Sequence, residues 1–280
     1  MNKLALGTVQ FGLDYGVTNL DGQMAIDEVK NILDYAKEKG IDTLDTASGY
    51  GTSEQVLGDV GVDNYQIITK TSSLKNGLDR VIKGFHQSLD NLNLEQVDGL
   101  LIHNIDDTKD NRFGELFHKL NELKEEGKIK KIGFSTYTPE QVDFLLENFD
   151  FDLIQVPFNV FDARLIEGGQ LQALKKKNIE IHARSVFLQG VLLGFDSLSD
   201  YFSTWDAQFE RYQEIVKEKE LSLLEYALNF VINTQELDKI LVGVDSVNQL
   251  TDIVHAFKSD VDLKAFKIDD INLLNPNLWN

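Results

Sequence analysis

The sequence predicts a (β/α)8 TIM barrel that forms a single domain over residues 1–280, and three observations support this fold class. Short apolar segments alternate with amphipathic helical segments from one end of the chain to the other. Only three prolines occur, and no Ser/Gly-rich linker marks a boundary between domains. Three successive predicted strands also place ionisable side chains at their carboxyl ends, Asp45 directly after one strand and Lys70 and His103 as the last residues of the next two, as expected where the strands of a barrel meet an active site.

The predicted strands are short runs rich in apolar residues. They cover Leu4–Thr8, Ile41–Leu44, Gln66–Lys70, Asp98–His103, Ile132–Ser135, Leu153–Pro157, Ile179–Ala183 and Lys239–Val242. Strands that alternate with helices are parallel and joined by right-handed crossovers, and eight such repeats close a barrel. An open, doubly wound sheet is the alternative, but the segment Gly7–Gly12 lacks the glycine spacing of its phosphate-binding turn.

The predicted helices follow from apolar residues at helical spacing. The first carries Ile26 to Ala36 and stops at Gly40, and the third carries Phe113 to Leu123 and stops at Gly127. Pro139 suits the first turn of a further helix. The remaining helices are expected over Val81–Leu92, Gly169–Lys177, Trp205–Lys219, Leu223–Asn233 and Val247–Phe257.

Two connections are unusually long, Gln10–Gln23 after the first strand and Arg184–Thr204 after the seventh. Both are rich in glycine and aromatic residues. Long loops in a compact fold usually bind something, so we expect them to frame a ligand site.

Composition restricts the partners. The formal charge of −19 disfavours a nucleic-acid backbone or an anionic membrane surface, because both would be repelled. The absence of cysteine excludes disulfides and cysteine catalysis. The start of the chain lacks the pattern of a signal peptide, and no segment approaches the ~20 apolar residues of a membrane span, so we expect a cytoplasmic location.

Asp45, Tyr50, Lys70 and His103 form a coherent acid group. A phenol with a pKa of ~10 is a poor proton donor at neutral pH. Lys70 beside Tyr50 would stabilise the phenolate, and Asp45 would keep Lys70 charged and oriented. His103 could position a carbonyl oxygen. Such a site can polarise a carbonyl group and protonate the developing alkoxide, but the hydride must come from a cofactor.

Each of these residues has an ordinary structural interpretation when taken alone. Asp45 could cap a helix, Tyr50 could pack in its loop, Lys70 could be solvated, and His103 could bond a backbone carbonyl. Their occurrence together at consecutive strand ends favours a site. The other four histidines (His86, His118, His182 and His255) form no ligand-spaced cluster, so no metal site is predicted.

At these residues the chain resembles the aldo-keto reductase family. The similar segments include Gly40–Ala47, Tyr50-Gly51, Ile68–Thr71 and Leu101–Asn104, and the resemblance extends over nearly the whole chain. It implies that Tyr50 is the proton donor, that Asp45 and Lys70 tune it, and that His103 orients the carbonyl.

The resemblance also implies an NAD(P)H cofactor. Gly133–Thr136 is similar to a family turn, so Ser135 and Gln155 would hold the carboxamide. Thr136, which replaces a usual asparagine, is also counted among the cofactor-binding residues. Asp45 and Thr8 would lie near the nicotinamide ribose, and Gly7 beside Thr8 is counted among the cofactor-binding residues.

Two departures from the family pattern concern the cofactor. Arg184 stands where an aromatic residue usually stacks on the nicotinamide, so its guanidinium would stack there or bind a substrate anion. The segment from Leu241 aligns with the adenosine-phosphate loop, where Gly243, Asp245, Ser246 and Gln249 are expected to contact the cofactor. No Lys or Arg follows until Lys258, so we expect NADH to be tolerated or preferred, unless Ser246 and backbone N–H groups hold a 2′-phosphate.

The leading hypothesis is a nicotinamide-dependent oxidoreductase that interconverts a small-molecule carbonyl compound and its alcohol. The segments Ala5–Gly12 and Arg184–Gly190 resemble a bacterial subgroup associated with sugar or surface-glycan metabolism. Three alternatives stay open: a Schiff-base barrel that uses Lys70, a nucleotide-binding redox sensor with little turnover, and epimerisation or dehydration of a sugar through a transient ketone.

Overall fold

The computed structural model describes residues 3–16, 23–196, 198–258 and 261–279, and these residues form a closed barrel of parallel strands. Each strand pairs with the next, and the last pairs with the first. The strands are β1 (Leu4–Gly7), β2 (Thr43–Asp45), β3 (Gln66–Lys70), β4 (Val97–Ile102), β5 (Ile129–Ser135), β6 (Leu153–Pro157), β7 (Glu180–Arg184) and β8 (Lys239–Gly243). The predicted fold class is confirmed, and every strand lies within three residues of its expected bounds.

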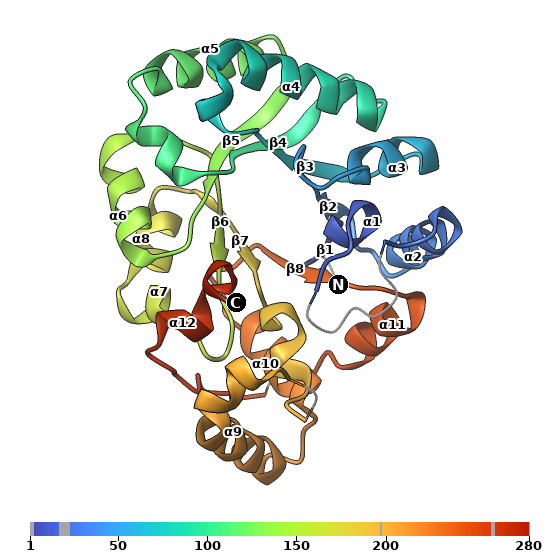
Figure 1. Cartoon of the computed structure of the whole chain (residues 1–280), viewed down its shortest axis with the longest axis vertical. Coiled ribbons are helices and arrows are strands. Elements are labelled where there is room, and N and C mark those ends of the chain that lie inside the picture. The colour runs from blue at the N-terminus through green and yellow to red at the C-terminus, as the bar shows by residue number, and fades with distance from the viewer. Residues whose placement is uncertain (1–2, 17–22, 197, 259–260, 280) are drawn as a thin grey trace.

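Helices surround the barrel, as Figure 1 shows. Those predicted from the sequence are α2 (Ile26–Glu38), α4 (Leu78–Leu92), α5 (Phe113–Glu125), α6 (Pro139–Asn148), α8 (Gln170–Lys176), α9 (Asp206–Glu218), α10 (Leu223–Ile232) and α11 (Val247–His255). Short helices α1 (Val9–Gly12), α7 (Arg164–Glu167) and α12 (Ile271–Leu274) lie in connections and near the end of the chain. The α6 helix begins with a capping box at Thr138 and Gln141, followed by Pro139.

The helix α3 (Ser53–Val60) was not predicted from the sequence. Its buried side includes Ser53 and Glu54 besides Leu57, so polar residues interrupt the apolar period that reveals the other helices. Glu54 accepts a hydrogen bond of 2.6 Å from Thr69 Oγ1 in β3. Gly58 lets α3 approach α4 closely, because a Cβ there would lie 2.1 Å from the Asn91 carbonyl oxygen.

The main apolar core fills the space between the barrel and the helices. A separate buried cluster consists of Ile68, Leu101 and Leu153, from β3, β4 and β6. Gly99 makes room for this cluster, since a Cβ at that position would lie within 3 Å of the Ile68 and Leu153 side chains.

Strand register brings the sequence-predicted residues to one end of the barrel. Asp45, the last residue of β2, is paired with Gly7, the last residue of β1, and on its other side with Ile68 in β3. Ser135 is paired with Gln155, and Gly7 with Gly243. Lys70 and Arg184 are the last residues of β3 and β7, and His103 directly follows β4. All these positions therefore face the same rim.

The two long connections differ in structure. The connection after β1 starts with α1, and residues 17–22 of it lie outside the described part of the chain. The connection after β7 contains 3-10 helices at Leu188–Leu193 and Asp200–Trp205. Ser185, Leu188 and Gln189 have positive φ angles, of 57°, 49° and 54°, which are uncommon for residues other than glycine. Backbone strain of this kind is most often found at functional sites.

Candidate active site

A cavity of about 620 Å³ opens at the carboxyl ends of the strands. This volume lies within the range of small-molecule and cofactor sites. The predicted acid group lines it, and so do most of the predicted cofactor residues. These lining residues are Asp45, Tyr50, Lys70, His103, Gly7, Thr8, Ser135, Gln155, Arg184, Gly243, Asp245 and Gln249. Thr136 and Ser246 are not among the lining residues.

Lys70 and Asp45 form a buried ion pair at the base of the cavity. The Lys70 Nζ lies 2.5 Å from Asp45 Oδ1, and both residues are at most 3 % exposed. Lys70 also donates to the Thr46 carbonyl oxygen at 2.9 Å, and Gln155 Nε2 donates to Asp45 Oδ2 at 2.6 Å. Both charges are thus held in one orientation by hydrogen bonds from fixed partners.

The environment of Lys70 keeps its ammonium group protonated. Burial acts to lower the pKa of Lys70, but the attraction of Asp45 and Tyr50 outweighs it, so the pKa lies above its ordinary value. The ammonium is therefore a permanent positive charge beside Tyr50, with its Nζ 5.0 Å from the centre of the Tyr50 ring.

A tight turn between β2 and α3 places Tyr50. The Tyr50 N–H donates to the Ala47 carbonyl oxygen, and the Ser53 N–H donates to the Tyr50 carbonyl oxygen, both at 3.0 Å. Gly51 has a φ of +56°, and a Cβ there would lie 2.3 Å from the Gly12 carbonyl oxygen, so the turn requires glycine at this position.

His103 lies across the cavity floor from Tyr50. The two rings meet edge to face, with centroids 6.2 Å apart. Burial and the nearby Lys70 charge lower the pKa of His103 to about 4. The imidazole is therefore neutral at pH 7 and has one N–H that can donate a hydrogen bond.

The residues expected to bind the nicotinamide have contrasting environments. Ser135 lines the cavity, and its hydroxyl makes no hydrogen bond within the described part of the chain. Gln155 donates through Nε2 to Asp45 and keeps its carbonyl oxygen as an acceptor. Thr8 donates to the Asp45 carbonyl oxygen and contacts Ser53 Oγ at 2.9 Å, so its hydroxyl stabilises the turn that carries Tyr50.

Thr136 and Ser246, which are also expected to contact the cofactor, do not line the cavity. The Thr136 Oγ1 is buried and has no hydrogen-bond partner among the described residues. The Ser246 hydroxyl caps α11 by accepting from the Gln249 N–H at 3.2 Å. The expected cofactor contacts of these two residues therefore stay predictions.

Arg184 and Tyr137 form a stacked pair at the side of the cavity. The Arg184 Cζ lies 4.3 Å from the Tyr137 ring centre, which is a close cation–π contact. Tyr137 lines the cavity but was not predicted as a site residue. Its position two residues after the end of β5 is the sequence signal that could have identified it.

The β8–α11 end of the cavity is acidic. Asp245 and Asp252 line it, and no Lys or Arg is among the described residues that line this end. The Gln249 side chain accepts from the Asp245 N–H at 2.8 Å. Glu28, from α2, accepts a hydrogen bond of 2.9 Å from the Val247 N–H in the first turn of α11. Glu28 was missed because nothing near it in sequence points to α11.

Apolar and aromatic side chains line the mouth, among them Tyr15, Phe187 and Leu193. Gln189 Nε2 donates to the Tyr15 hydroxyl at 3.0 Å, which joins the connection after β7 to the connection after β1. The two long connections therefore frame the cavity, as their length and composition predict.

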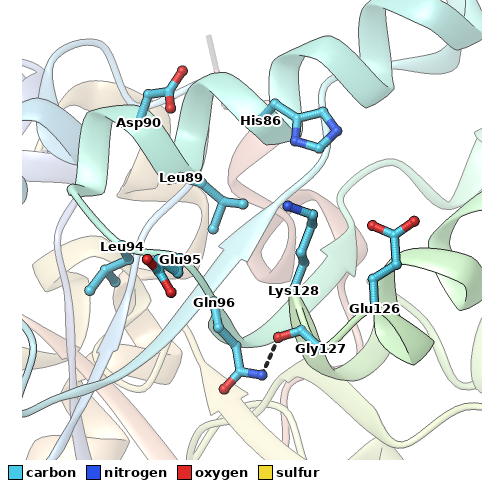
Figure 2. A pocket seen from close by; sticks show the side chains of 9 residues that line it. All are labelled: His86, Leu89, Asp90, Leu94, Glu95, Gln96, Glu126, Gly127 and Lys128. Carbon is cyan, nitrogen blue, oxygen red and sulfur yellow. Dashed lines mark hydrogen bonds between the residues drawn. The ribbon is translucent and has the colours of Figure 1, made fainter.

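A second hollow, of about 580 Å³, lies at the amino-terminal side of the barrel (Figure 2). Its walls are the end of α4, with His86 and Asp90, and the turn before β5, with Glu126 and Lys128. Gln96 donates to the Gly127 carbonyl oxygen across it. The hollow is far from the acid group, because the loops that precede parallel strands lie at the opposite end of a barrel.

Two further findings concern the described residues only. No helix among them is long and apolar enough to cross a membrane. They also contain no group of three or more His, Asp or Glu side chains placed to hold a metal ion.

The cavity fits a nicotinamide nucleotide by its donor set. A carboxamide carries one acceptor oxygen and an NH₂ donor. The paired residues Ser135 of β5 and Gln155 of β6 both line the cavity and offer a hydroxyl and a carbonyl oxygen. The cavity then continues to β8 and α11, which leaves room for the remainder of a dinucleotide.

Comparison with known proteins is consistent with this geometry. The model of the Aldo/keto reductase family matches residues 3–274. An L-galactose dehydrogenase of Arabidopsis thaliana is 27% identical over 273 residues, which cover 90% of this chain and 85% of that protein. An NADH-specific methylglyoxal reductase of Escherichia coli is 24% identical over 307 residues, covering 94% and 92%.

Solved structures agree in fold. A glycerol dehydrogenase of Gluconobacter oxydans superimposes with a TM-score of 0.72 at 23% identity, covering 93% of this chain and 88% of that chain. An aldo-keto reductase of Bacillus halodurans in its holo form superimposes with a TM-score of 0.74 at 20% identity, covering 92% and 87%. The chain therefore belongs to the aldo/keto reductase family, whose members are oxidoreductases that act on carbonyl and alcohol compounds.

Proposed function

We propose that this protein reduces an aldehyde or ketone to the alcohol, and catalyses the reverse reaction, with Tyr50 as the general acid. One observation carries the proposal: the buried Asp45–Lys70 pair holds a positive charge 5.0 Å from the Tyr50 ring centre. A fixed ammonium beside a tyrosine can stabilise the phenolate that forms when the hydroxyl gives its proton to a substrate.

His103 and Tyr50 would receive the carbonyl oxygen together. The neutral His103 imidazole donates one hydrogen bond to this oxygen, and the Tyr50 hydroxyl donates the second. As negative charge develops on the oxygen, Tyr50 transfers its proton and Lys70 stabilises the phenolate that remains. Asp45, held by Gln155, keeps the Lys70 charge in position throughout.

Ser135 and Gln155 would hold the cofactor. The Ser135 hydroxyl donates to the carboxamide oxygen, and the Gln155 carbonyl oxygen accepts from the carboxamide NH₂. When bound there, a reduced nicotinamide nucleotide supplies the hydride.

For the nucleotide, we propose a preference for NADH. Asp245 and Asp252 line the β8–α11 end of the cavity. The Glu28 carboxylate accepts a hydrogen bond from the Val247 N–H at the start of α11. A helix N-terminus attracts a phosphate through its N–H groups, but here a carboxylate already binds one of them. A 2′-phosphate would meet like charge, whereas a free 2′-hydroxyl can donate to a carboxylate.

Titration calorimetry with NADH and NADPH tests this preference. Wild type should bind NADH at least tenfold more tightly. Glu28→Gln should strengthen NADPH binding by about 3- to 10-fold, because it removes charge near the helix terminus and keeps an acceptor for Val247. Asp27→Asn, on the neighbouring exposed residue of α2, makes the same charge change as a control and should leave both affinities unchanged. Tighter NADPH binding by wild type would refute the preference.

For the substrate, we propose a small polar carbonyl compound such as a sugar derivative. The cavity mouth combines aromatic side chains, including Tyr15 and Tyr137, with polar groups such as Gln189. Sugar rings bind well to such mixed surfaces, where aromatic faces pack on C–H groups and amides bond hydroxyls. Two relatives, named L-galactose dehydrogenase and methylglyoxal reductase, act on compounds of this polarity according to their names.

Transfer of deuterium tests the reaction itself. The protein is incubated with NADH deuterated at C4 and a panel of aldehydes and keto sugars, and the products are examined by mass spectrometry. We expect deuterium on the carbinol carbon of the product. Binding of the nucleotide without transfer would support a redox-sensing protein instead. Epimerised or dehydrated sugar without net nucleotide oxidation would support chemistry through a transient ketone.

A Schiff-base mechanism at Lys70 is disfavoured by the same geometry. An amine nucleophile must be neutral, and a lowered pKa makes it so. The pKa of Lys70 is raised, and its Nζ already contacts Asp45 and Thr46. Borohydride should therefore trap no substrate on Lys70, and a trapped adduct would contradict the proposed acid role.

A further inference from the structure

Arg184 is held in the cavity wall by contacts on several sides. Its Nη2 donates to the Thr136 carbonyl oxygen at 3.0 Å, and its Nη1 donates to Ser185 Oγ at 3.1 Å. The Tyr137 ring lies 4.3 Å below the guanidinium carbon. A guanidinium has five N–H donors, and three of them make no hydrogen bond within the described part of the chain. Arg184 is therefore preorganised and keeps donors available.

No carboxylate forms a salt bridge with Arg184 within the described residues. Among the residues that line the cavity, Lys70 and Arg184 carry full positive charges. Lys70 is paired with Asp45, but within the described residues Arg184 forms no salt bridge. Its charge also reaches the catalytic groups, since Arg184 contributes to the lowered pKa of His103. A partly buried cation without a carboxylate partner is costly unless a ligand neutralises it.

Stacking of Arg184 on the nicotinamide is the less favourable use of this cation. One face of the guanidinium already contacts Tyr137. The nicotinamide ring also becomes positively charged when it is oxidised, and a second cation against it would be repelled. A carboxylate matches both the charge and the planar fork of Arg184.

We propose that Arg184 forms a substrate-binding subsite for a carboxylate, so that the protein acts on carbonyl compounds that also carry a carboxylate group. This inference rests on the proposed carbonyl reduction and specifies its substrate class. Arg184, Tyr50 and His103 line the same cavity, so a carboxylate at Arg184 would orient the carbonyl group of the same molecule toward the acid group. Such positioning raises the rate for the anionic substrate selectively.

Two matched aldehydes test the subsite, 4-carboxybenzaldehyde and the neutral 4-(hydroxymethyl)benzaldehyde, each assayed with saturating nucleotide. Arg184→Gln should lower kcat/KM for 4-carboxybenzaldehyde by about 10- to 100-fold, which is the loss expected for charge-assisted hydrogen bonds. The kcat/KM for the neutral aldehyde should change by less than about threefold. The kcat/KM of Arg184→Lys for 4-carboxybenzaldehyde should lie between those of wild type and Arg184→Gln, because lysine keeps the charge and loses the planar fork. Arg80→Gln, an exposed arginine of α4, makes the same charge change outside the cavity and should match wild type.

The outcomes separate the possible roles of Arg184. Equal losses on both aldehydes together with weaker nucleotide binding would overturn the subsite and support cofactor stacking. Calorimetry with benzoate and benzamide gives a readout that needs no turnover: wild type should bind benzoate more tightly, and Arg184→Gln should bind both equally. If neither aldehyde is reduced but this benzoate preference holds, the subsite stands and the carbonyl reduction fails. Equal binding of benzoate and benzamide by wild type would refute the subsite.

Discussion

At the scale of single residues, His103 couples the site to the stability of the fold. Its pKa of about 4 in the folded protein lies well below the ~6.5 of an unfolded histidine. Between these values the unfolded chain binds more protons, so stability rises with pH across this window. The contribution of His103 is fully present above about pH 6.5 and is lost as the pH falls to about 4.

We therefore expect His103→Gln to flatten the pH dependence of unfolding. In urea titrations between pH 7 and pH 4, the free energy of unfolding of wild type should fall by up to about 3 kcal/mol more than that of His103→Gln, as the change in pKa implies. His118→Gln makes the same substitution at an exposed position of α5 and serves as the control. Parallel slopes for wild type and His103→Gln would show that the imidazole is not forced to stay neutral.

The grouping of Asp45, Lys70 and His103 could be predicted from the sequence because the carboxyl ends of the strands in a barrel lie at one end of it. Asp45, Lys70 and His103 end or follow consecutive strands, and barrel topology alone brings them together. Finer placement could not be predicted. Ser135 and Thr136 are adjacent, and neighbouring residues along an extended chain face opposite sides, so one lines the cavity and the other does not. Glu28 reaches Val247 across 219 residues, which no local pattern can show.

At the scale of elements, the pairing of β5 with β6 depends on Gly133. A Cβ at this position would lie 1.8 Å from the Leu153 carbonyl oxygen, in the backbone of the neighbouring strand. The same pairing sets Ser135 opposite Gln155, the two residues proposed to hold the carboxamide. A close approach of two strands thus builds part of the site.

Replacement of Gly133 by alanine should destabilise the protein by about 2 kcal/mol or more, because backbone must move to accept the methyl group. Gly114→Ala is the matched control. It lies in α5, where a Cβ would meet nothing within 4 Å, and it should stabilise by about 0.5–1 kcal/mol through helix propensity. Urea denaturation of both variants measures the difference, and similar free energies for the two would contradict the close strand contact.

Most elements were predictable because the barrel repeats one simple pattern of apolar strand and amphipathic helix. The helix α3 was not, since its inward side carries Ser53 and Glu54, which a search for apolar periodicity overlooks. Their role becomes visible only in three dimensions, where Glu54 binds Thr69 and Ser53 binds the backbone of Thr8.

At the scale of the whole molecule, the two ends of the barrel differ in charge organisation. Ion pairs join lysines to carboxylates at or just before the amino-terminal ends of strands: Lys239–Asp42, Lys130–Asp98, Lys124–Asp152, Lys131–Glu180 and Lys175–Asp238. Three of these carboxylates, Asp98, Asp152 and Asp238, also accept a backbone N–H from the preceding strand. This end stabilises the barrel, and the opposite end carries the candidate site.

The net charge of −19 nevertheless leaves unbalanced repulsion over the surface. The ion pairs at the amino-terminal end of the barrel are mostly half-exposed and weak. We therefore expect the repulsion between surface charges to dominate the response of stability to salt. The Tm should rise by a few degrees between low salt and about 0.5 M sodium chloride, a salt that acts mainly by screening. Scanning calorimetry measures this change. A falling Tm would show that the ion pairs at the amino-terminal end of the barrel affect stability more than the net charge does.

The claim at the centre of this account is that Tyr50 donates the proton, and two tyrosines of one cavity allow a direct test. Tyr50 lies beside Lys70 and His103, whereas Tyr15 lines the mouth. The measurement is kcat for aldehyde reduction, with nucleotide affinity measured in parallel, for Tyr50→Phe and Tyr15→Phe. We expect Tyr50→Phe to bind the nucleotide as wild type does and to lose about 10²- to 10⁴-fold in kcat. The kcat of Tyr15→Phe should stay within several-fold of the wild-type value. A Tyr50→Phe variant that keeps the wild-type kcat would contradict the account.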